Sequence, residues 1–205
     1  EFYLYLQKGV FMIKITNVLS AVNGCSNIAL CGGSLRTLLL PNDTIVDYDI
    51  FILDKFDELD SDIQTLDKVI KIFEAYGFNV TFRCPLNELV NLKSGDLKVQ
   101  IIYKYKSKQT TEDILDQFDI NLGRIGLHQG SIYVAPEAIK DSMKNRITIN
   151  IPTYPSSTLQ RIIKYSQKGF YMDHEARADF LFKIIELYNK NPNSLLEQLG
   201  LYAID

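Results

Sequence analysis

Apolar residues recur along the chain with two periods, and each period predicts a different kind of element. Residues 12–24, Ser34–Leu40 and Asp60–Tyr76 have the spacing of helices, and Gly77 stands where the last of these needs a C-terminal cap. Short apolar runs bounded by turn residues predict buried strands. These strands are Ile28–Cys31, Ile45–Leu53, Asn79–Phe82 and Lys98–Tyr103, with Asn87–Gly95 as the connection between the last two.

The pattern changes from strands to helices in the second half of the chain. A short helix is expected to begin at Thr111, and a small strand pair at Leu122–His128 and Ser131–Val134. Three more helices are predicted at Pro136–Lys144, Ser157–Phe170 and Glu175–Tyr188. This order predicts an α+β fold with a head domain at residues 12–150 and a helical tail at 151–205. Residues 1–11 are interpreted as an N-terminal extension or a vector remnant before Met12.

Composition excludes several classes of protein. The 205 residues are 46% hydrophobic and 23% charged, which is typical of a globular chain long enough to bury a core. The chain has 22 basic and 25 acidic residues, so we do not expect a surface that binds nucleic acid through net positive charge alone. No apolar run approaches the ~18 residues that span a bilayer, so we expect no membrane contact. The three cysteines form no CxxC pair, which favours a reduced, cytoplasmic protein.

One segment combines a glycine turn with paired carboxylates. Gly32-Gly33-Ser34 follows a predicted strand and begins a predicted helix, where glycines let the backbone approach a phosphate and amide groups point at the anion. Asp47 and Asp49 lie two apart on the next strand, so their side chains point the same way, about 7 Å apart. Two such carboxylates repel each other unless a cation lies between them, and oxygen ligands of this kind suit Mg²⁺.

In these residues the sequence resembles the nucleotidyltransferase superfamily, and most closely the head domain of poly(A) polymerases and tRNA CCA-adding enzymes. That head has a Gly-Gly-x-x-Arg-Asp turn and a following Asp-x-Asp strand, which Gly32–Arg36 and Asp47–Asp49 resemble. The resemblance extends more loosely over residues 25–170. It includes the segments Gln117–Asn121, Ala138–Asp141 and Leu159–Phe170.

The resemblance implies a mixed sheet flanked by helices and a magnesium-dependent transfer of a nucleoside monophosphate from an NTP, ATP or CTP. Asp47 and Asp49 would hold two Mg²⁺ ions, and the turn with Ser34 would contact the triphosphate. Arg36 would neutralise phosphate charge, with a surface salt bridge as the alternative. The remaining candidates are Asp119 as a catalytic residue and Arg124, Arg161 and Lys164 as nucleotide-binding residues. For Asp119 a capping role is the alternative, and for Arg161 and Lys164 a solvated helix face.

The sequence departs from the family pattern at two positions. Gln100 stands where family members usually have a third carboxylate, and Thr37 replaces the aspartate of the turn motif. An amide oxygen can coordinate Mg²⁺ but adds no charge and cannot act as a base. Three alternatives follow. Two aspartates are enough for catalysis, a neighbour such as Asp119 supplies the third negative charge, or the protein binds nucleotides without efficient turnover.

Three functions fit these residues. The first is transfer to an RNA 3′ end, with tRNA-like RNA as the partner. The second is transfer to a protein or a small molecule, as in toxin-type and antibiotic-modifying members of the superfamily. The third is a weakly catalytic NTP-binding module, which Gln100 favours and the intact Asp-x-Asp opposes. The acceptor, the nucleotide preference and the oligomeric state are not specified by the sequence.

Overall fold

The computed structural model describes residues 16–40, 47–84, 89–103 and 108–190. They form two compact units. Unit 1 comprises the described residues up to Ile114 together with Gly126–Tyr133, and unit 2 comprises Leu115–Ile125 and the described residues from Val134 onward. The head and tail predicted from the sequence, with their boundary near residue 150, remain a prediction about folding domains, and residues 1–11 lie outside the described part.

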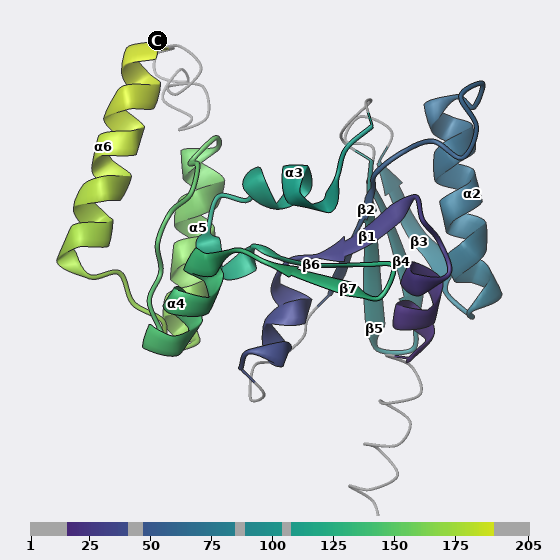
Figure 1. Ribbon diagram of the computed structural model, residues 1–205, viewed down its shortest axis with the longest axis horizontal. Coiled ribbons are helices and arrows are strands. Elements are labelled where there is room, and N and C mark those ends of the chain that lie inside the picture. Colours follow the sequence, from purple (N-terminus) through teal and green to yellow (C-terminus); the bar gives the residue numbers. More distant parts are fainter. Residues whose placement is uncertain (1–15, 41–46, 85–88, 104–107, 191–205) are drawn as a thin grey trace, which may run out of the picture. The chain divides into compact units, whose positions relative to one another are not determined.

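The chain forms a sheet of seven strands in the order β3-β4-β5-β2-β1-β6-β7 (Figure 1). Strands β2 and β5 are parallel, whereas β1 with β2, β1 with β6, β3 with β4 and β4 with β5 are antiparallel, so the sheet is mixed. The strands are β1 (Ile28–Cys31), β2 (Tyr48–Ile52), β3 (Asn79–Cys84), β4 (Leu89–Ser94), β5 (Leu97–Ile102), β6 (Ile125–His128) and β7 (Ser131–Val134).

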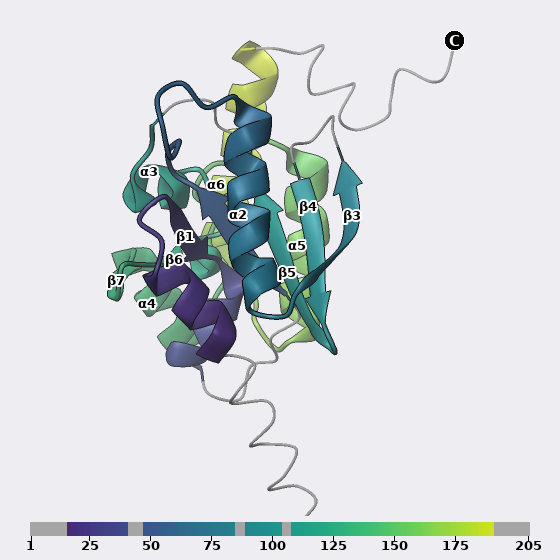
Figure 2. The ribbon, with the colours of Figure 1, turned by 90° about the vertical axis from the view of Figure 1, so that its right-hand side faces the viewer.

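One face of this sheet is covered by helix α2 (Asp62–Ala75), which lies along the strands (Figure 2). The helix begins at a capping box in which Ser61 and Gln64 satisfy each other's backbone N–H groups. The apolar side of α2 is buried, and the sheet residues beneath it are nearly all inaccessible to solvent. These sheet residues are Leu30, Ile50, Val90, Leu92, Val99 and Ile101. A second helix at residues 16–23 lies at the C-terminal end of α2, where Asn17 donates to the carbonyl of Tyr76.

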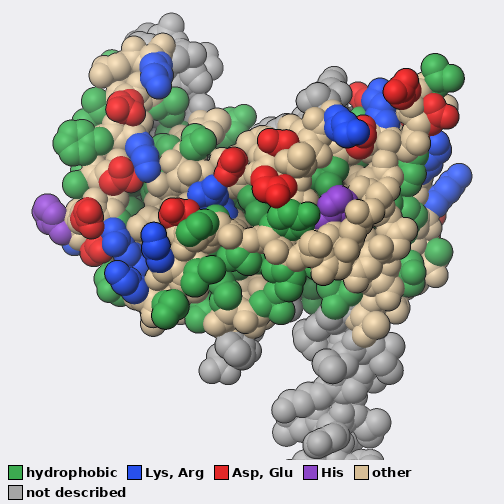
Figure 3. All heavy atoms as spheres, in the orientation of Figure 1, with side chains coloured by type: hydrophobic (Ala, Val, Ile, Leu, Met, Phe, Trp, Pro, Cys, Tyr) green, Lys and Arg blue, Asp and Glu red, His purple; other side chains and the backbone are tan. Residues whose placement is uncertain are grey.

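Unit 2 is mainly helical. It contains η2 (Asn121–Gly123), α4 (Pro136–Lys144), α5 (Pro155–Gln167) and α6 (His174–Lys190), while α3 (Thr111–Asp116) crosses the boundary between the units. Its buried residues include Ile120, Leu122, Ile147, Ile149 and Phe180. Helix α6 also exposes large apolar side chains, Leu181, Phe182 and Ile185 among them, and green side chains are visible along this helix in Figure 3. Among the described helices, none has the length and apolarity that crossing a membrane requires.

The structure confirms the expected α+β class and most expected elements, with three corrections. Residues 87–95 are not a connection, because Leu89–Ser94 forms strand β4 between β3 and β5. The helix expected at Ser34–Leu40 is a short 3-10 helix, η1 (Gly33–Leu38). The small strand pair begins at Ile125 and not at Leu122, because η2 occupies the preceding residues. The expected residues of helix 12–24 and strand 45–53 that precede 16 and 47 lie outside the described part.

Candidate active site

The glycine turn directly follows strand β1. Gly32 has φ 98° and ψ −157°, a backbone conformation open to glycine and strained for any residue with a Cβ atom. The chain can therefore leave β1 abruptly and enter η1 at Gly33. The glycine at position 32 is a conformational requirement, and the sharp turn it permits places Ser34 at the end of the central sheet.

Two polar side chains of this turn are buried. Ser34 is 7% exposed, and among the described residues its hydroxyl has no hydrogen-bond partner. An unpaired buried hydroxyl costs about 1–3 kcal/mol, so Ser34 fits an anion-binding position whose phosphate oxygen would accept the hydrogen bond. Arg36 is 2% exposed and so does not lie on a solvated helix surface, and its role toward phosphate remains a prediction. Thr37 donates to the Ser34 carbonyl at 3.0 Å and so secures the turn.

The two aspartates lie at the start of β2. Asp47 immediately precedes the strand and Asp49 is its second residue. Burial alternates along this segment, because both aspartates are half-buried whereas Tyr48 and Ile50 are 3% and 0% exposed. Side chains alternate between the two faces of a strand, so the aspartates lie on the face opposite to that of Tyr48 and Ile50. The alternation in burial ends at Phe51, which is 8% exposed, so the aspartate face is accessible only at the start of β2. Both carboxylates thus belong to the face of the sheet opposite α2.

The strand register brings the aspartates to the glycine turn. Cys31, the residue before Gly32, is the cross-strand partner of Asp49, and Asp49 is also the partner of Gln100 on β5. Burial, with the charge of Asp49 as a second cause, raises the pKa of the Cys31 thiol, so this cysteine is a neutral, inert neighbour of the carboxylate. Residues 18 positions apart in the sequence therefore meet in one row across the sheet because β1 and β2 are antiparallel.

Gln100 follows Cys31 and Asp49 in this row of cross-strand partners. Its side-chain nitrogen donates to Asn91 Oδ1 at 3.0 Å, which leaves the amide oxygen as the atom able to coordinate a cation. Among the described residues, no group of three or more histidine, cysteine or acidic side chains could hold a metal ion. The oxygen donors predicted for a cation here are the carboxylates of Asp47 and Asp49 and the amide oxygen of Gln100. Such hard oxygen ligands fit Mg²⁺, which keeps several waters and takes other ligands from phosphate.

Asp119 belongs to unit 2 and is engaged by helix α5. Its Oδ2 atom accepts hydrogen bonds from Arg161 Nε at 2.8 Å and from Thr158 Oγ1 at 2.6 Å, and Arg161 Nη2 lies 2.7 Å away. The Asp119 side chain is 12% exposed, whereas that of Arg161 is 46% exposed. These contacts give Asp119 and Arg161 a structural role, because they hold α5 against the segment that contains Asp119. Their catalytic and nucleotide-binding assignments remain predictions.

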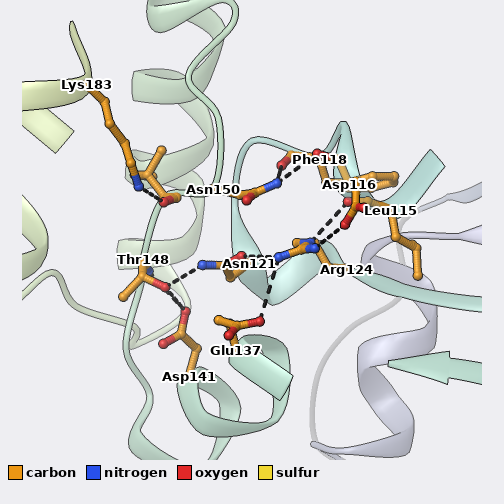
Figure 4. A network of polar contacts seen from close by, with 11 residues as sticks. Leu115, Asp116, Phe118, Asn121, Arg124, Glu137, Asp141, Thr148, Asn150 and Lys183 are labelled. Atoms are coloured by element: carbon orange, nitrogen blue, oxygen red, sulfur yellow. Dashed lines mark hydrogen bonds and ion pairs between the residues drawn. The ribbon is translucent and has the colours of Figure 1, made fainter. Parts of the chain in front are cut away.

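Arg124 also takes part in a network within unit 2 (Figure 4). Its guanidinium donates to the Leu115 carbonyl at 3.2 Å and to Asn121 Oδ1 at 3.1 Å, and it forms an ion pair with Asp116. Glu137 Oε2 lies 3.8 Å from Arg124 Nη1. The nucleotide-binding role predicted for Arg124 stays a prediction, as does that of Lys164, which is exposed on α5.

Asn91 is not among the site residues predicted from the sequence, because residues 87–95 were interpreted as a connection. A signal was present, since Gly95-Asp96 is a two-residue hairpin loop between the alternating segments Leu89–Leu92 and Leu97–Ile101. Gly95 has φ 60°, as the first position of a type II′ hairpin turn requires. The partner of Gln100 could thus have been placed by pairing these segments across the loop.

No protein-family model and no curated protein sequence matches this chain. Solved structures do match it. A tRNA nucleotidyltransferase complexed with a primer tRNA and an ATP analogue has a TM-score of 0.57 at 15% identity, over 85% of this chain and 52% of that chain. A CCA-adding enzyme with CTP has a TM-score of 0.61 at 14% identity, over 93% and 50%. The CCA-adding enzyme of Bacillus stearothermophilus with CTP has 0.54 at 13%, over 80% and 42%.

These similarities establish the fold. The described chain has the fold of a nucleotidyltransferase head of the poly(A) polymerase and CCA-adding type, as the glycine turn and Asp-x-Asp strand predicted. The chain spans about half the length of the solved structures that it matches.

Proposed function

We propose that this protein is a metal-dependent nucleotidyltransferase that transfers a nucleoside monophosphate from an NTP to the 3′ hydroxyl of an RNA. The proposal rests above all on one observation, the pairing of Cys31 with Asp49. In this register a glycine turn of the kind that can bind phosphate lies beside a pair of carboxylates, on the face of the sheet opposite α2. The nucleotidyltransferase fold supports it.

Each part of the turn has a defined task in this reaction. The backbone at Gly32-Gly33 and the hydroxyl of Ser34 bind the triphosphate tail and hold the α-phosphorus toward the carboxylates. The acceptor oxygen attacks that phosphorus, a new oxygen–phosphorus bond forms, pyrophosphate leaves, and the hydroxyl proton passes to solvent. Asp47, Asp49 and the amide oxygen of Gln100 would hold Mg²⁺, which supplies neutralisation of phosphate charge and activation of the hydroxyl.

The proposal predicts that Asp47→Asn abolishes transfer and leaves the fold intact. Loss of one carboxylate removes several kcal/mol of charge stabilisation, which corresponds to a loss of about 10²- to 10⁴-fold in rate. The measurement is transfer of α-labelled ATP, CTP, GTP or UTP to total tRNA with Mg²⁺, together with pyrophosphate release. Asp54→Asn, at the other end of β2 and paired with Lys108, is the matched control and should keep full activity. Transfer at the wild-type rate by the Asp47 variant would contradict the assignment.

The same assay separates the other candidate functions. Label on the protein itself or on an added protein, and none on RNA, would identify a protein-modifying transferase. The presence of Gln100 where a third carboxylate is expected favours an NTP-binding module. That function predicts nucleotide binding without pyrophosphate release for any acceptor.

A further inference from the structure

The uncovered face of strands β3, β4 and β5 carries a second set of side chains beside the aspartates. We call it the acceptor face and define it by five residues, Phe82, Asn91, Lys93, Lys98 and Gln100. Phe82 is 53% exposed, both lysines are exposed, and the two amides are half-buried. The alternate residues of β4 and β5, by contrast, are buried under α2.

The register arranges this face as two rows. Asp49, Gln100 and Asn91 are successive cross-strand partners, and Phe82 is the partner of Asn91 on the edge strand. Lys98 and Lys93 are partners two residues further along their strands, on the same face, and lie beside that row. Neighbouring strands are about 4.8 Å apart, so Phe82 lies about 14 Å from Asp49 across three strand spacings. The rows therefore run from the candidate metal ligands to the edge of the sheet.

A β-bulge puts Phe82 on this face. The register of β3 against β4 shifts between Val80 and Phe82, so that Val80 pairs with the buried Leu92 while Phe82 pairs with Asn91. Without the extra residue, strict alternation would turn Phe82 toward α2. Bulges of this kind re-aim side chains next to functional sites. Because of this bulge, the exposed ring of Phe82 lies on the same face of the sheet as Asp49.

Lys93 and Lys98 are directly opposite each other on β4 and β5, an arrangement that is unfavourable when no ligand is bound. Like charges on directly opposite residues of an antiparallel pair destabilise a sheet. In the described part of the chain, neither Lys93 nor Lys98 forms an ion pair that would offset this repulsion. A polyanion lying across β4 and β5 would offset it, because it would contact both ammonium groups.

We infer that the acceptor face binds the single-stranded 3′ end of the acceptor RNA, with Phe82 stacking on a base and Lys93 and Lys98 contacting backbone phosphates. Exposed aromatic side chains combined with basic ones bind single-stranded nucleic acid because every base has a π-face and every nucleotide a phosphate. Asn91, whose Oδ1 accepts a hydrogen bond from Gln100, lies between the stacking position and the aspartates. This inference rests on the proposed function for the direction of the strand, since the terminal hydroxyl must reach Asp47 and Asp49.

The test is equilibrium binding of a short 5′-fluorescein-labelled single-stranded RNA, followed by fluorescence anisotropy at several salt concentrations. Phe82→Ala should weaken binding by about 5- to 100-fold, whereas Phe82→Tyr should retain it. Lys93→Ala and Lys98→Ala should each lower the slope of log K against log salt by about 0.7. Val80→Ala, on the other face of the same strand, and Lys71→Ala, on α2, are the matched controls and should leave affinity and slope unchanged.

Two further measurements distinguish a loss of single-stranded RNA binding from a general loss of ligand binding. Binding of a non-hydrolysable NTP analogue with Mg²⁺ should be unaffected by the three alanine variants, and a blunt RNA duplex should not respond to Phe82→Ala. Unchanged single-strand affinity in all three variants would overturn the inference, as would a loss confined to NTP binding. Transfer activity with unchanged RNA affinity would keep the proposed function and remove this surface. If the wild-type protein shows no transfer activity but the variants lose RNA affinity, the acceptor face stands as an RNA-binding surface and the proposed function is wrong.

Discussion

Gly32 shows how a single residue fixes the geometry of the candidate site. Its φ of 98° lies where a side chain is strained, whereas Gly33 has no positive φ. The two glycines therefore have different reasons to be glycine. Gly32 is needed by the fold, and Gly33 can serve the close approach of a phosphate.

We expect Gly32→Ala to destabilise the protein by about 1–3 kcal/mol, because the Cβ atom is forced into a strained backbone conformation. Gly33→Ala should cost less than about 1 kcal/mol and still weaken NTP binding. Urea unfolding of both variants, followed by NTP titration, measures the two effects separately. Equal stability of the two variants would show that the positive φ is not what requires glycine at position 32.

Gln100 is the residue at which this chain departs from a three-carboxylate site. Gln100→Glu adds a third negative charge of the same shape beside Asp49, which strengthens attraction for a divalent cation. We expect the Kd for Mn²⁺, measured by calorimetry, to fall roughly tenfold. The metal-free variant should also be less stable than the wild type, because three carboxylates repel one another. Unchanged Mn²⁺ affinity would remove Gln100 from the ligand set.

At the scale of elements, the region around helix α4 depends on polar contacts that the periodicity of the sequence does not reveal. Asp141 on α4 is 4% exposed, and its Oδ2 accepts from the backbone N–H of Thr148 at 3.1 Å and from the Thr148 hydroxyl. Asn121 donates to the same hydroxyl, so α4, η2 and the segment at Thr148 form one network (Figure 4).

Burial raises the pKa of Asp141 above its usual value of 3.8. The folded state therefore holds this proton more tightly than the unfolded state, and the resulting stabilisation is present below pH 3.8 and lost as the pH rises through the folded pKa. Asp141→Asn stays neutral throughout. The unfolding free energy of the variant minus that of the wild type should thus increase with pH over this range. Urea unfolding at a series of pH values measures it, and a difference that is flat in pH would contradict the shift.

At the scale of the whole molecule, the proposed site links ligand binding to stability. A ligand at 100 times its Kd stabilises a folded protein by about 2.7 kcal/mol, which raises the Tm of a chain of this size by about 5–10 °C. We expect this rise with an NTP and Mg²⁺ together, and its loss in the double variant Asp47→Asn, Asp49→Asn. Differential scanning fluorimetry measures it. A full rise in the double variant would place the nucleotide elsewhere in the molecule.

The sequence alone determined the local chemistry of this protein. The Gly-Gly-Ser turn, the two-residue spacing of Asp47 and Asp49 and the periodicity of α2 depend on contacts between near neighbours, and such patterns are visible in a linear chain. They were sufficient for the α+β class and for the resemblance to a nucleotidyltransferase head, whose fold the solved structures share.

Only the tertiary structure decided which distant residues share a row. The pairing of Cys31 with Asp49, of Gln100 with Asn91 and of Asp119 with Arg161 joins segments whose order in space is set by sheet topology and helix packing. The bulge that turns Phe82 to the aspartate side depends on register with β4, because one extra residue reverses which face a side chain occupies. Strand order and register are properties of the folded sheet, and no single segment encodes them.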